Sequence, residues 1–564
     1  MANLIRPGTA QPDASAVQDV APLYSPRHRP LPRPLWRRIL HPVTAICAVQ
    51  TALSLTLVWS NTAFTDEAEY LWAGHLEISH WLHGTPLPSI FSHNFSGSPY
   101  IYPPIGAMAD AVGGLAAARI LSLIFMLGAT ALLYLVAKRL FGNAAALIAS
   151  ALWAISEPAM RLGAFATYDA LSIFLTALSA WLAVQAGYRR HRGELVAASA
   201  AVLALANATA YYGIVIDPVV IVFVFLAWLS AIGAKQARIC AAWLSGTYLA
   251  FFVLIMTESH SWAGIIHTTG FVAHNDAVAL ILNSIWAYSG SCMVLAAIGA
   301  TTAIFAEKGS KRILIVLLGC AALVVPVAQI VDHTEVSLDQ HLPYGLWFAA
   351  MAAGYGCSKL VQSLPTSRRI PAILCCGLAL AYPAADNWQA AWYKQLSWSN
   401  SSSFVSAFKP VAGQAHGLIY ASTQGYVAMY YIPQGHDWTR WNRSELSRSE
   451  LPLDPSGIPQ NSWIAFYSKL LRKIGYGAIA LFYTTTVRGL PGEMVLPSQN
   501  NIARGQLLNI VASDTGSASR PMRGLPALTL AVENDSAYRL VTVGPYSTNT
   551  INGIYAIWQK KAQT

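Results

Sequence analysis

Apolar residues along this chain gather in long runs separated by short polar stretches. A helix needs about 20 such residues to cross roughly 30 Å of hydrocarbon, and eleven runs approach that length. They fall at residues 41–60, 115–137, 143–160, 167–187, 195–213, 218–234, 237–257, 282–305, 313–331, 342–361 and 370–387. The pattern predicts a mainly α-helical, polytopic membrane protein with about eleven spans, in which residues 40–387 form the transmembrane module.

Lysines and arginines predict the orientation of these spans, because they are enriched on the cytoplasmic side of membranes. Up to residue 387, nineteen of them occur in the Pro/Arg-rich segment 1–39 or in every second loop, whereas the intervening loops hold only Arg161, with Arg119 at the entrance of a span. No small-residue cleavage site follows the first apolar run, so a signal peptide is not predicted. We expect a disordered cytoplasmic tail over residues 1–39 and a multi-pass protein of the plasma (inner) membrane, with the C-terminal region outside.

Residues 388–564 follow a different pattern. Short aromatic and β-branched runs, such as Gly417–Tyr420, Tyr426–Tyr430, Ala478–Tyr483 and Tyr538–Val543, alternate with Gly, Pro, Asn and Ser. Such runs are typical of strands and turns. We expect one soluble, extracytoplasmic α/β or β-rich domain. Its tryptophans, among them Trp438 and Trp441, suit either core packing or sugar binding.

Composition narrows the class of protein. Hydrophobic residues make up 55% of the 564 residues and charged residues 11%, against about 25% charged in soluble domains. This excludes a disordered chain, a nucleic-acid-binding module and an ordinary soluble enzyme. The seven cysteines lie in apolar runs without a CxxC pair, so we expect buried structural thiols rather than a zinc site or disulfides.

A loop of some fifty residues, 61–114, separates the first two predicted spans, and loops this long are usually functional. Asp66 and Glu67 follow directly after the first span, where a carboxylate is costly to hold close to hydrocarbon unless it is solvated or used. Apolar residues from Tyr70 to His83 recur at helical spacing, which predicts an amphipathic helix at the membrane interface. Asp66 alternatively serves as the N-cap of this helix.

Several short motifs in the first 190 residues resemble the GT-C class of membrane glycosyltransferases, in particular the branch of protein O-mannosyltransferases and lipid A aminoarabinose transferases. These motifs are Asp66-Glu-Ala-Glu-Tyr70, Tyr102-Pro-Pro-Ile105, Ala118-Arg119-Ile-Leu-Ser122, Arg161 and Thr167-Tyr-Asp169. The resemblance covers residues 40–190 by motif and the remaining spans by topology and length.

The resemblance implies a glycosyltransferase that takes a hexosyl or pentosyl group from a polyprenyl phosphate. The acceptor is a hydroxyl of a cell-envelope glycan, a glycolipid or a protein, and the anomeric carbon is inverted. Asp66 is expected to be the general base, with Glu67 and Asp169 completing the catalytic carboxylates. A positioned carboxylate contributes roughly 10²–10⁴-fold by taking the proton of a hydroxyl. Asp169 alternatively caps the fourth span.

Cationic donors are needed to hold the departing phosphate. Arg161 is the first candidate, although pairing with Glu157 or Asp169 is an alternative. Arg119 either binds phosphate or anchors the membrane interface. His341 occupies the place where relatives carry a basic residue, yet it also suits an ordinary loop position. Tyr102 stands where many relatives have a lysine before Pro-Pro, which puts the phosphate geometry in question.

The loop 258–281 carries Glu258, Asp276 and the histidines His260, His267 and His274. Two His-x₆-His spacings match no ligand pattern of a particular metal, so polar packing is the expected role. We predict neither a metal nor another cofactor, and no nucleic-acid partner.

Two other classes of function remain open on the sequence. A transporter or flippase places charged or broken elements near the membrane midplane and often has repeated halves, whereas the carboxylates here cluster at the outer ends of spans. A non-catalytic polysaccharide-assembly protein would keep the scaffold without the chemistry.

Overall fold

The computed structural model describes residues 42–88, 95–258, 262, 264–266, 276–422, 425–432, 438–441, 457–487, 525–549 and 551–562. These described residues all belong to one compact unit, Pro42–Thr564. The predicted cytoplasmic tail lies outside the described residues, and so do His260, His267 and His274.

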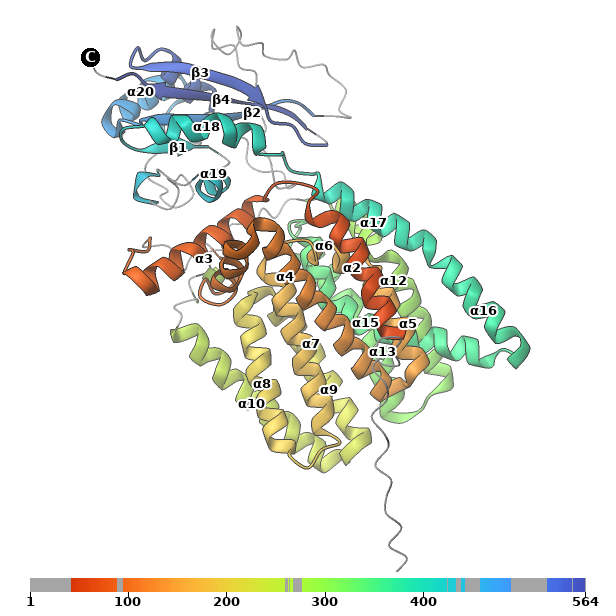
Figure 1. Cartoon of the computed structure of the whole chain (residues 1–564). Coiled ribbons are helices and arrows are strands. Elements are labelled where there is room, and N and C mark those ends of the chain that lie inside the picture. Colours follow the sequence, from red (N-terminus) through yellow and green to blue (C-terminus); the bar gives the residue numbers. More distant parts are fainter. Residues whose placement is uncertain are drawn as a thin grey trace, which may run out of the picture. The chain divides into compact units, whose positions relative to one another are not determined.

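Helices make up the first two thirds of the described chain (Figure 1). They are α2 (Pro42–Val58), α3 (Thr65–His83), α4 (Tyr102–Phe141), α5 (Asn143–Ala154), α6 (Glu157–Leu162), α7 (Tyr168–Ala186), α8 (Arg192–Thr209), η2 (Tyr211–Ile216), α9 (Asp217–Ile232), α10 (Ala234–Glu258), α12 (Val278–Ala306), α13 (Gly309–Cys320), η3 (Ala321–Leu323), α14 (Val324–Val331), α15 (Leu338–Ser363), α16 (Thr366–Ala379) and α17 (Ala381–Gln395).

Each predicted apolar run coincides with one helix or with consecutive helices. Among the described residues, six segments are long and apolar enough to cross a membrane. They are Tyr102–Phe141, Tyr168–Ala186, Tyr211–Ile232, Ala234–Thr257, Val278–Ala306 and Gly309–Val331. Eleven spans and the orientation of the termini stay predictions.

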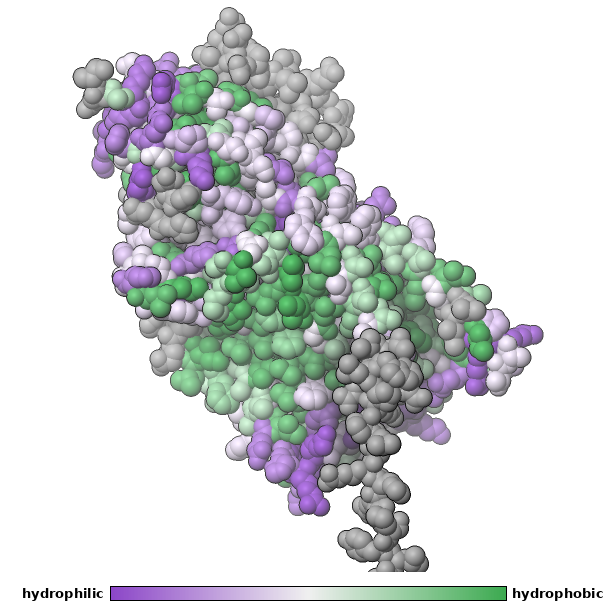
Figure 2. Space-filling view, in the orientation of Figure 1, coloured by the Kyte–Doolittle hydropathy of each residue, from purple (hydrophilic) through white to green (hydrophobic). Residues whose placement is uncertain are grey.

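The outward faces of these helices suit a lipid environment. Hydrophobic residues cover much of the helical part of the surface, and hydrophilic residues gather at the helix ends (Figure 2). Trp243 and Trp286 each expose more than half of their surface, which would be unfavourable in water. Inside, α15 packs against α12, α5 and α13, and Trp347 donates its indole N–H to the carbonyl of Ala129 at 3.0 Å. The chain is a membrane protein.

Two glycines divide α4 into an outer helix and a spanning helix. Gly113 and Gly114 leave helical geometry, and Gly114 has φ 65° and ψ −165°, a conformation that only glycine adopts readily. Tyr102–Val112 therefore continues the loop region in helical form, and α3 packs against α4.

The C-terminal part contains a mixed four-stranded sheet in the order β1-β2-β4-β3. Its strands are β1 (Ile419–Ala421), β2 (Ala478–Val487), β3 (Tyr538–Pro545) and β4 (Ile551–Lys560), and its helices are α18 (Ser402–Gln414), α19 (Gly425–Tyr431), α20 (Trp463–Ile474) and α22 (Leu525–Glu533). β1 pairs parallel to β2, and the other two pairings are antiparallel. Phe482 of β2 faces the α18 side, whereas Leu481 faces α20 and α22, as the alternation of side chains along a strand requires.

The strand-like prediction for Tyr426–Tyr430 is wrong, because these residues form α19. This helix packs on α3 and buries Tyr426, Val427, Ala428 and Met429. A short apolar run suits a buried helix as well as a strand, and contact with another helix decides between them here. Trp441 lies in the same apolar cluster, 4% exposed, so its place is in the core.

Candidate active site

The start of α3 is organised by Glu67 rather than by Asp66. Phe64 holds the N-cap position, which corrects the alternative of Asp66 as the cap. The Glu67 carboxylate accepts the backbone N–H of Phe64 at 3.0 Å and that of Ala166 at 2.8 Å. It also receives Arg119 Nε at 2.8 Å and Nη2 at 2.6 Å, with both side chains fully buried. The sequence signal for this arrangement was the acidic residue at the third helical position.

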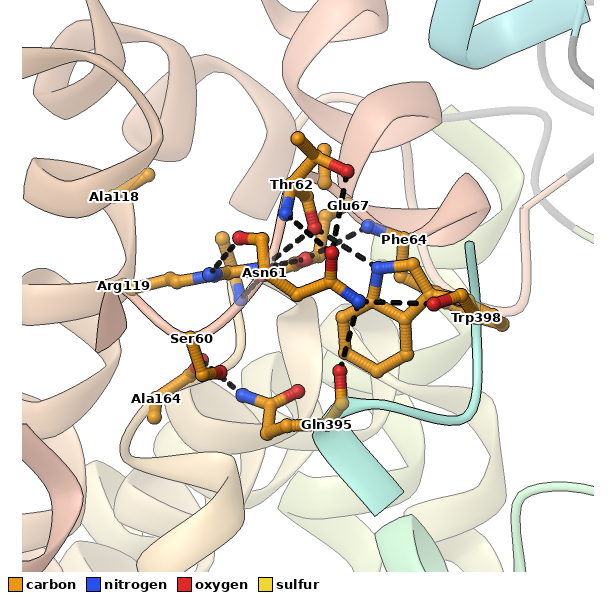
Figure 3. Close-up of polar contacts among 12 residues, drawn as sticks. Ser60, Asn61, Thr62, Phe64, Glu67, Ala118, Arg119, Ala164, Gln395 and Trp398 are labelled. Atoms are coloured by element: carbon orange, nitrogen blue, oxygen red, sulfur yellow. Dashed lines mark hydrogen bonds and ion pairs between the residues drawn. The ribbon is translucent and has the colours of Figure 1, made fainter. Parts of the chain in front are cut away.

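Arg119 has no donor to spare. Beyond its two bonds to Glu67, Nη1 donates to the carbonyls of Val58 and Asn61 at 2.7 and 2.9 Å, and Nη2 donates to that of Thr62 at 3.2 Å (Figure 3). A guanidinium has five N–H donors, so the group is satisfied within the protein. Its position fixes the chain between α2 and α3 and leaves nothing for phosphate.

A second set of bonds ties the end of α17 to the same turn (Figure 3). Asn61 Nδ2 donates to the carbonyls of Gln395 and Trp398, each at 3.0 Å. The Trp398 indole donates to the carbonyl of Thr62 at 2.9 Å, and Gln395 Nε2 donates to that of Ala164 at 3.0 Å. Segments more than 300 residues apart are thereby held at one place.

Asp66 differs from Glu67 in its exposure and in its hydrogen bonding. Its side chain is partly exposed, and its carboxylate accepts no hydrogen bond from any residue that the structure describes. Burial raises the pKa of Asp66 to about 6, helped by the negative charge of Glu67 and opposed by the positive charge of Arg161. An unpartnered carboxylate of that pKa suits the acceptance of a proton near neutral pH.

Asp169 lies in the first turn of α7, within range of repulsion by Asp66. Thr167, the N-cap residue, donates its hydroxyl to Asp169 Oδ2 at 2.9 Å. Oδ1 is buried and has no partner among the described residues. The structure therefore brings Asp66, Asp169 and Arg161 close enough for their charges to act on one another.

Arg161 pairs with Asp339 of α15, not with Glu157 or Asp169. Its guanidinium lies 4.6 Å from the ring centre of Phe165. Nε is buried and finds no acceptor among the described residues. An unmatched buried donor is costly, so Arg161 has capacity for a further anion.

Glu157 is fully buried beside these cations, and neither of its oxygens has a partner within the described chain. The positive charges of Arg161 and Lys394 both act on this carboxyl group.

Sequence reasoning missed Asp339 and Lys394. Lys394 Nζ lies 3.8 Å from Asp339 Oδ1, in the last turn of α17. Its signal was present, since Lys394 is a lone basic residue a few positions after the last predicted span.

Tyr102 and His341 both pack against aromatic rings. Tyr102 is fully buried, with its ring 6.4 Å from that of Tyr70. His341 stacks on Tyr212 at 3.5 Å between ring centres, and its Nδ1 lies 2.9 Å from Gln329 Nε2. A phosphate role for either stays a prediction. Within the described chain, no group of three His, Cys, Asp or Glu residues is placed to hold a metal.

Comparison with known proteins sets this site in a fold. Residues 111–262 match the family model described as dolichyl-phosphate-mannose-protein mannosyltransferase. The archaeal oligosaccharyltransferase AglB from Archaeoglobus fulgidus aligns with TM-score 0.53 at 12% identity, over 91% of this chain and 80% of that one. The chain has the GT-C glycosyltransferase fold.

Other proteins share the GT-C fold with this chain. The mycobacterial arabinofuranosyltransferase AftD aligns with TM-score 0.51 at 14% identity, over 92% of this chain and 40% of AftD. ArnT from Cupriavidus metallidurans aligns with TM-score 0.50 at 12% identity, over 78% of this chain and 92% of ArnT. No curated protein matches the sequence. The resemblance stated from the motifs and the predicted GT-C-like fold class are confirmed.

Proposed function

We propose that this chain is an integral-membrane glycosyltransferase. It moves a sugar from a polyprenyl phosphate to an acceptor hydroxyl on the extracytoplasmic side, with inversion. The observation that carries the proposal is the Asp66 carboxylate. It accepts no hydrogen bond from the described residues, its pKa is raised to about 6, and Asp169 and Arg161 are close by.

The chemistry requires one base and one anion site. Asp66 takes the proton of the acceptor hydroxyl as its oxygen attacks the anomeric carbon. The bond from that carbon to the phosphate oxygen breaks, and its electron pair stays with the phosphate. Arg161, whose buried Nε has no acceptor among the described residues, stabilises the negative charge that develops on the phosphate.

Glu67 and Asp169 have supporting roles in this scheme. The Glu67 oxygens accept hydrogen bonds from Arg119 and two backbone amides. Glu67 therefore positions the first turn of α3, which carries Asp66. Asp169 keeps Oδ1 without a partner in the described chain and orients the acceptor or the sugar.

The comparisons support the proposed class of carrier. The matching family is described by a dolichyl-phosphate mannose donor, and AglB has been solved with a dolichol-phosphate. A polyprenyl-phosphate sugar is the corresponding donor for this chain, and a hydroxyl of an envelope glycan, glycolipid or protein is its acceptor. Its location is the plasma (inner) membrane.

The decisive experiment replaces Asp66 with Asn in the full chain, reconstituted in lipid nanodiscs. Polyprenyl-phosphate donors carrying mannose, galactose, arabinose or an aminosugar are supplied with envelope-glycan acceptors, and product is followed by mass spectrometry. We expect Asp66→Asn to lower turnover by roughly 10²–10⁴-fold while donor affinity is kept.

Asp386→Asn is the matched control, because it removes an exposed carboxylate on α17 and leaves turnover unchanged. Full activity of the Asp66 variant would contradict the proposal. A transporter, a flippase or an assembly protein would be indifferent to the change.

A further inference from the structure

Asp339 bridges two cations that come from different helices. One oxygen accepts Arg161 Nη1 from α6, and the other lies 3.8 Å from Lys394 Nζ of α17. Asp339 is 3% exposed at its side chain and Lys394 is 23% exposed. The carboxylate therefore holds a guanidinium and an ammonium beside each other, and the ammonium remains accessible.

Both cations keep unused donors. Arg161 Nε is buried and unmatched among the described residues. The Lys394 ammonium has three donors, and its contacts in the described chain are Asp339 and the ring of Tyr288, 5.8 Å from its centre. Two adjacent cations with spare donors match the two non-bridging oxygens of a phosphate ester.

We propose that Arg161 and Lys394, held together by Asp339, form a two-cation seat for the phosphate of the lipid carrier. The inference rests on the proposed function and extends it with a second phosphate-binding residue, Lys394, and a positioning residue, Asp339.

The end of α17 is fixed where the seat requires it. Gln395, the residue after Lys394, donates to the carbonyl of Ala164 and accepts Asn61 Nδ2, each at 3.0 Å (Figure 3). Asn61 lies in the turn that leads to Asp66. The network that fixes the turn before Asp66 therefore also fixes Lys394, which we assign to the departing phosphate.

The charge balance explains why one cation is insufficient. A polyprenyl-phosphate sugar is a diester with one negative charge. When the bond to the anomeric carbon breaks, the departing monoester gains a second charge, since its second pKa is about 6. Asp339 offsets one of the two cations, and Lys394 meets the charge that appears only as the sugar leaves. Interactions that strengthen during the reaction raise turnover rather than ground-state affinity.

Glu157 does not cancel the seat. Its oxygens make no hydrogen bond to Arg161 or to any other described residue. A further anion that enters beside Glu157 disfavours the ionised form of its carboxyl group, which limits the negative charge that Glu157 adds next to the seat.

The test measures binding of undecaprenyl phosphate to the full chain in phosphatidylcholine nanodiscs. Lys394→Gln removes a charge-assisted hydrogen bond to the phosphate and is expected to weaken this binding about tenfold or more. Binding of an intact diester donor should weaken by less, and kcat should fall more than KM rises. Lys394→Arg should restore binding, and Lys409→Gln, an exposed lysine on α18, should leave it unchanged.

A second measurement needs no variant and so does not depend on folding. Phosphorus NMR of undecaprenyl phosphate bound to the native chain should show a second pKa below the usual value of about 6, because two cations favour the dianion. An unshifted titration, or native affinity in Lys394→Gln, would overturn the inference.

Other phosphate sources are separated by competition. Excess phosphatidylglycerol in the nanodisc or inorganic phosphate in solution should fail to displace undecaprenyl phosphate; displacement by either would overturn a seat built for the carrier. If Asp66→Asn abolishes transfer but Lys394→Gln keeps native affinity for the carrier, only the two-cation seat is contradicted. If carrier binding depends on Lys394 but no donor supports transfer, only the proposed function is contradicted.

Discussion

Arg119 and Arg161 are both buried, and both pair with a carboxylate. Arg119 uses all of its donors on Glu67 and three backbone carbonyls. Arg161 has one carboxylate partner and a buried Nε without an acceptor in the described chain.

The difference separates a structural cation from one available to a ligand. A buried arginine whose donors are all satisfied stabilises the fold and has no hydrogen bond left for a ligand. A buried arginine with an unmatched donor carries a free-energy cost, which is relieved when an anion binds. The number of satisfied donors, rather than burial or charge, therefore distinguishes the two.

The largest expected effect is on stability, at Arg119. Arg119→Met leaves the buried Glu67 without its counter-charge and should lower the free energy of unfolding by about 3–5 kcal/mol. Denaturant or thermal unfolding in detergent measures it, with Arg190→Gln, an exposed arginine, as the control. A variant of native stability that has lost carrier binding would instead make Arg119 a ligand residue.

Next comes the loss of transfer at Arg161. Arg161→Gln should lower turnover by about 10²–10³-fold, as expected for removal of one donor to developing charge. Its unfolding free energy should fall by less than that of Arg119→Met, because Lys394 stays 3.8 Å from Asp339. Turnover within tenfold of the native rate would remove Arg161 from the phosphate site.

The smallest effect is on pH dependence. Only deprotonated Asp66 accepts a proton, so turnover should fall as the pH is lowered through the pKa of about 6. Because the Arg161 charge holds that pKa down, Arg161→Gln should move the acid limb of kcat/KM upward by less than about one unit. Rate profiles between pH 5 and pH 8 measure the shift. An acid limb that stays in place would mean that Asp66 is not the titrating base.

Much of the fold was accessible from the sequence, because long apolar runs and their spacing are local properties. The helix after residue 64 and the position of Asp66 followed from the point where an apolar run ends. The pairing of Glu67 with Arg119 did not follow, since 52 residues separate them and both are charged residues of ordinary appearance.

The pairing of Lys394 with Arg161 through Asp339 could not be predicted for the same reason. Lys394 lies more than 200 residues after Arg161 and meets it only through Asp339. The N-cap was misjudged because Glu67, one position further on, supplies the carboxylate that returns to the helix start. Such features depend on tertiary contacts that no local pattern encodes.

The predicted division at residue 388 passes through α17, and this has a practical consequence for engineering. A chain shortened after residue 387 would keep Asp66 and Arg161 yet lose Lys394, Gln395 and Trp398. Any graft of a foreign C-terminal domain must therefore join beyond residue 398, because the last helical turns before the sheet belong, by their bonds, to the membrane half.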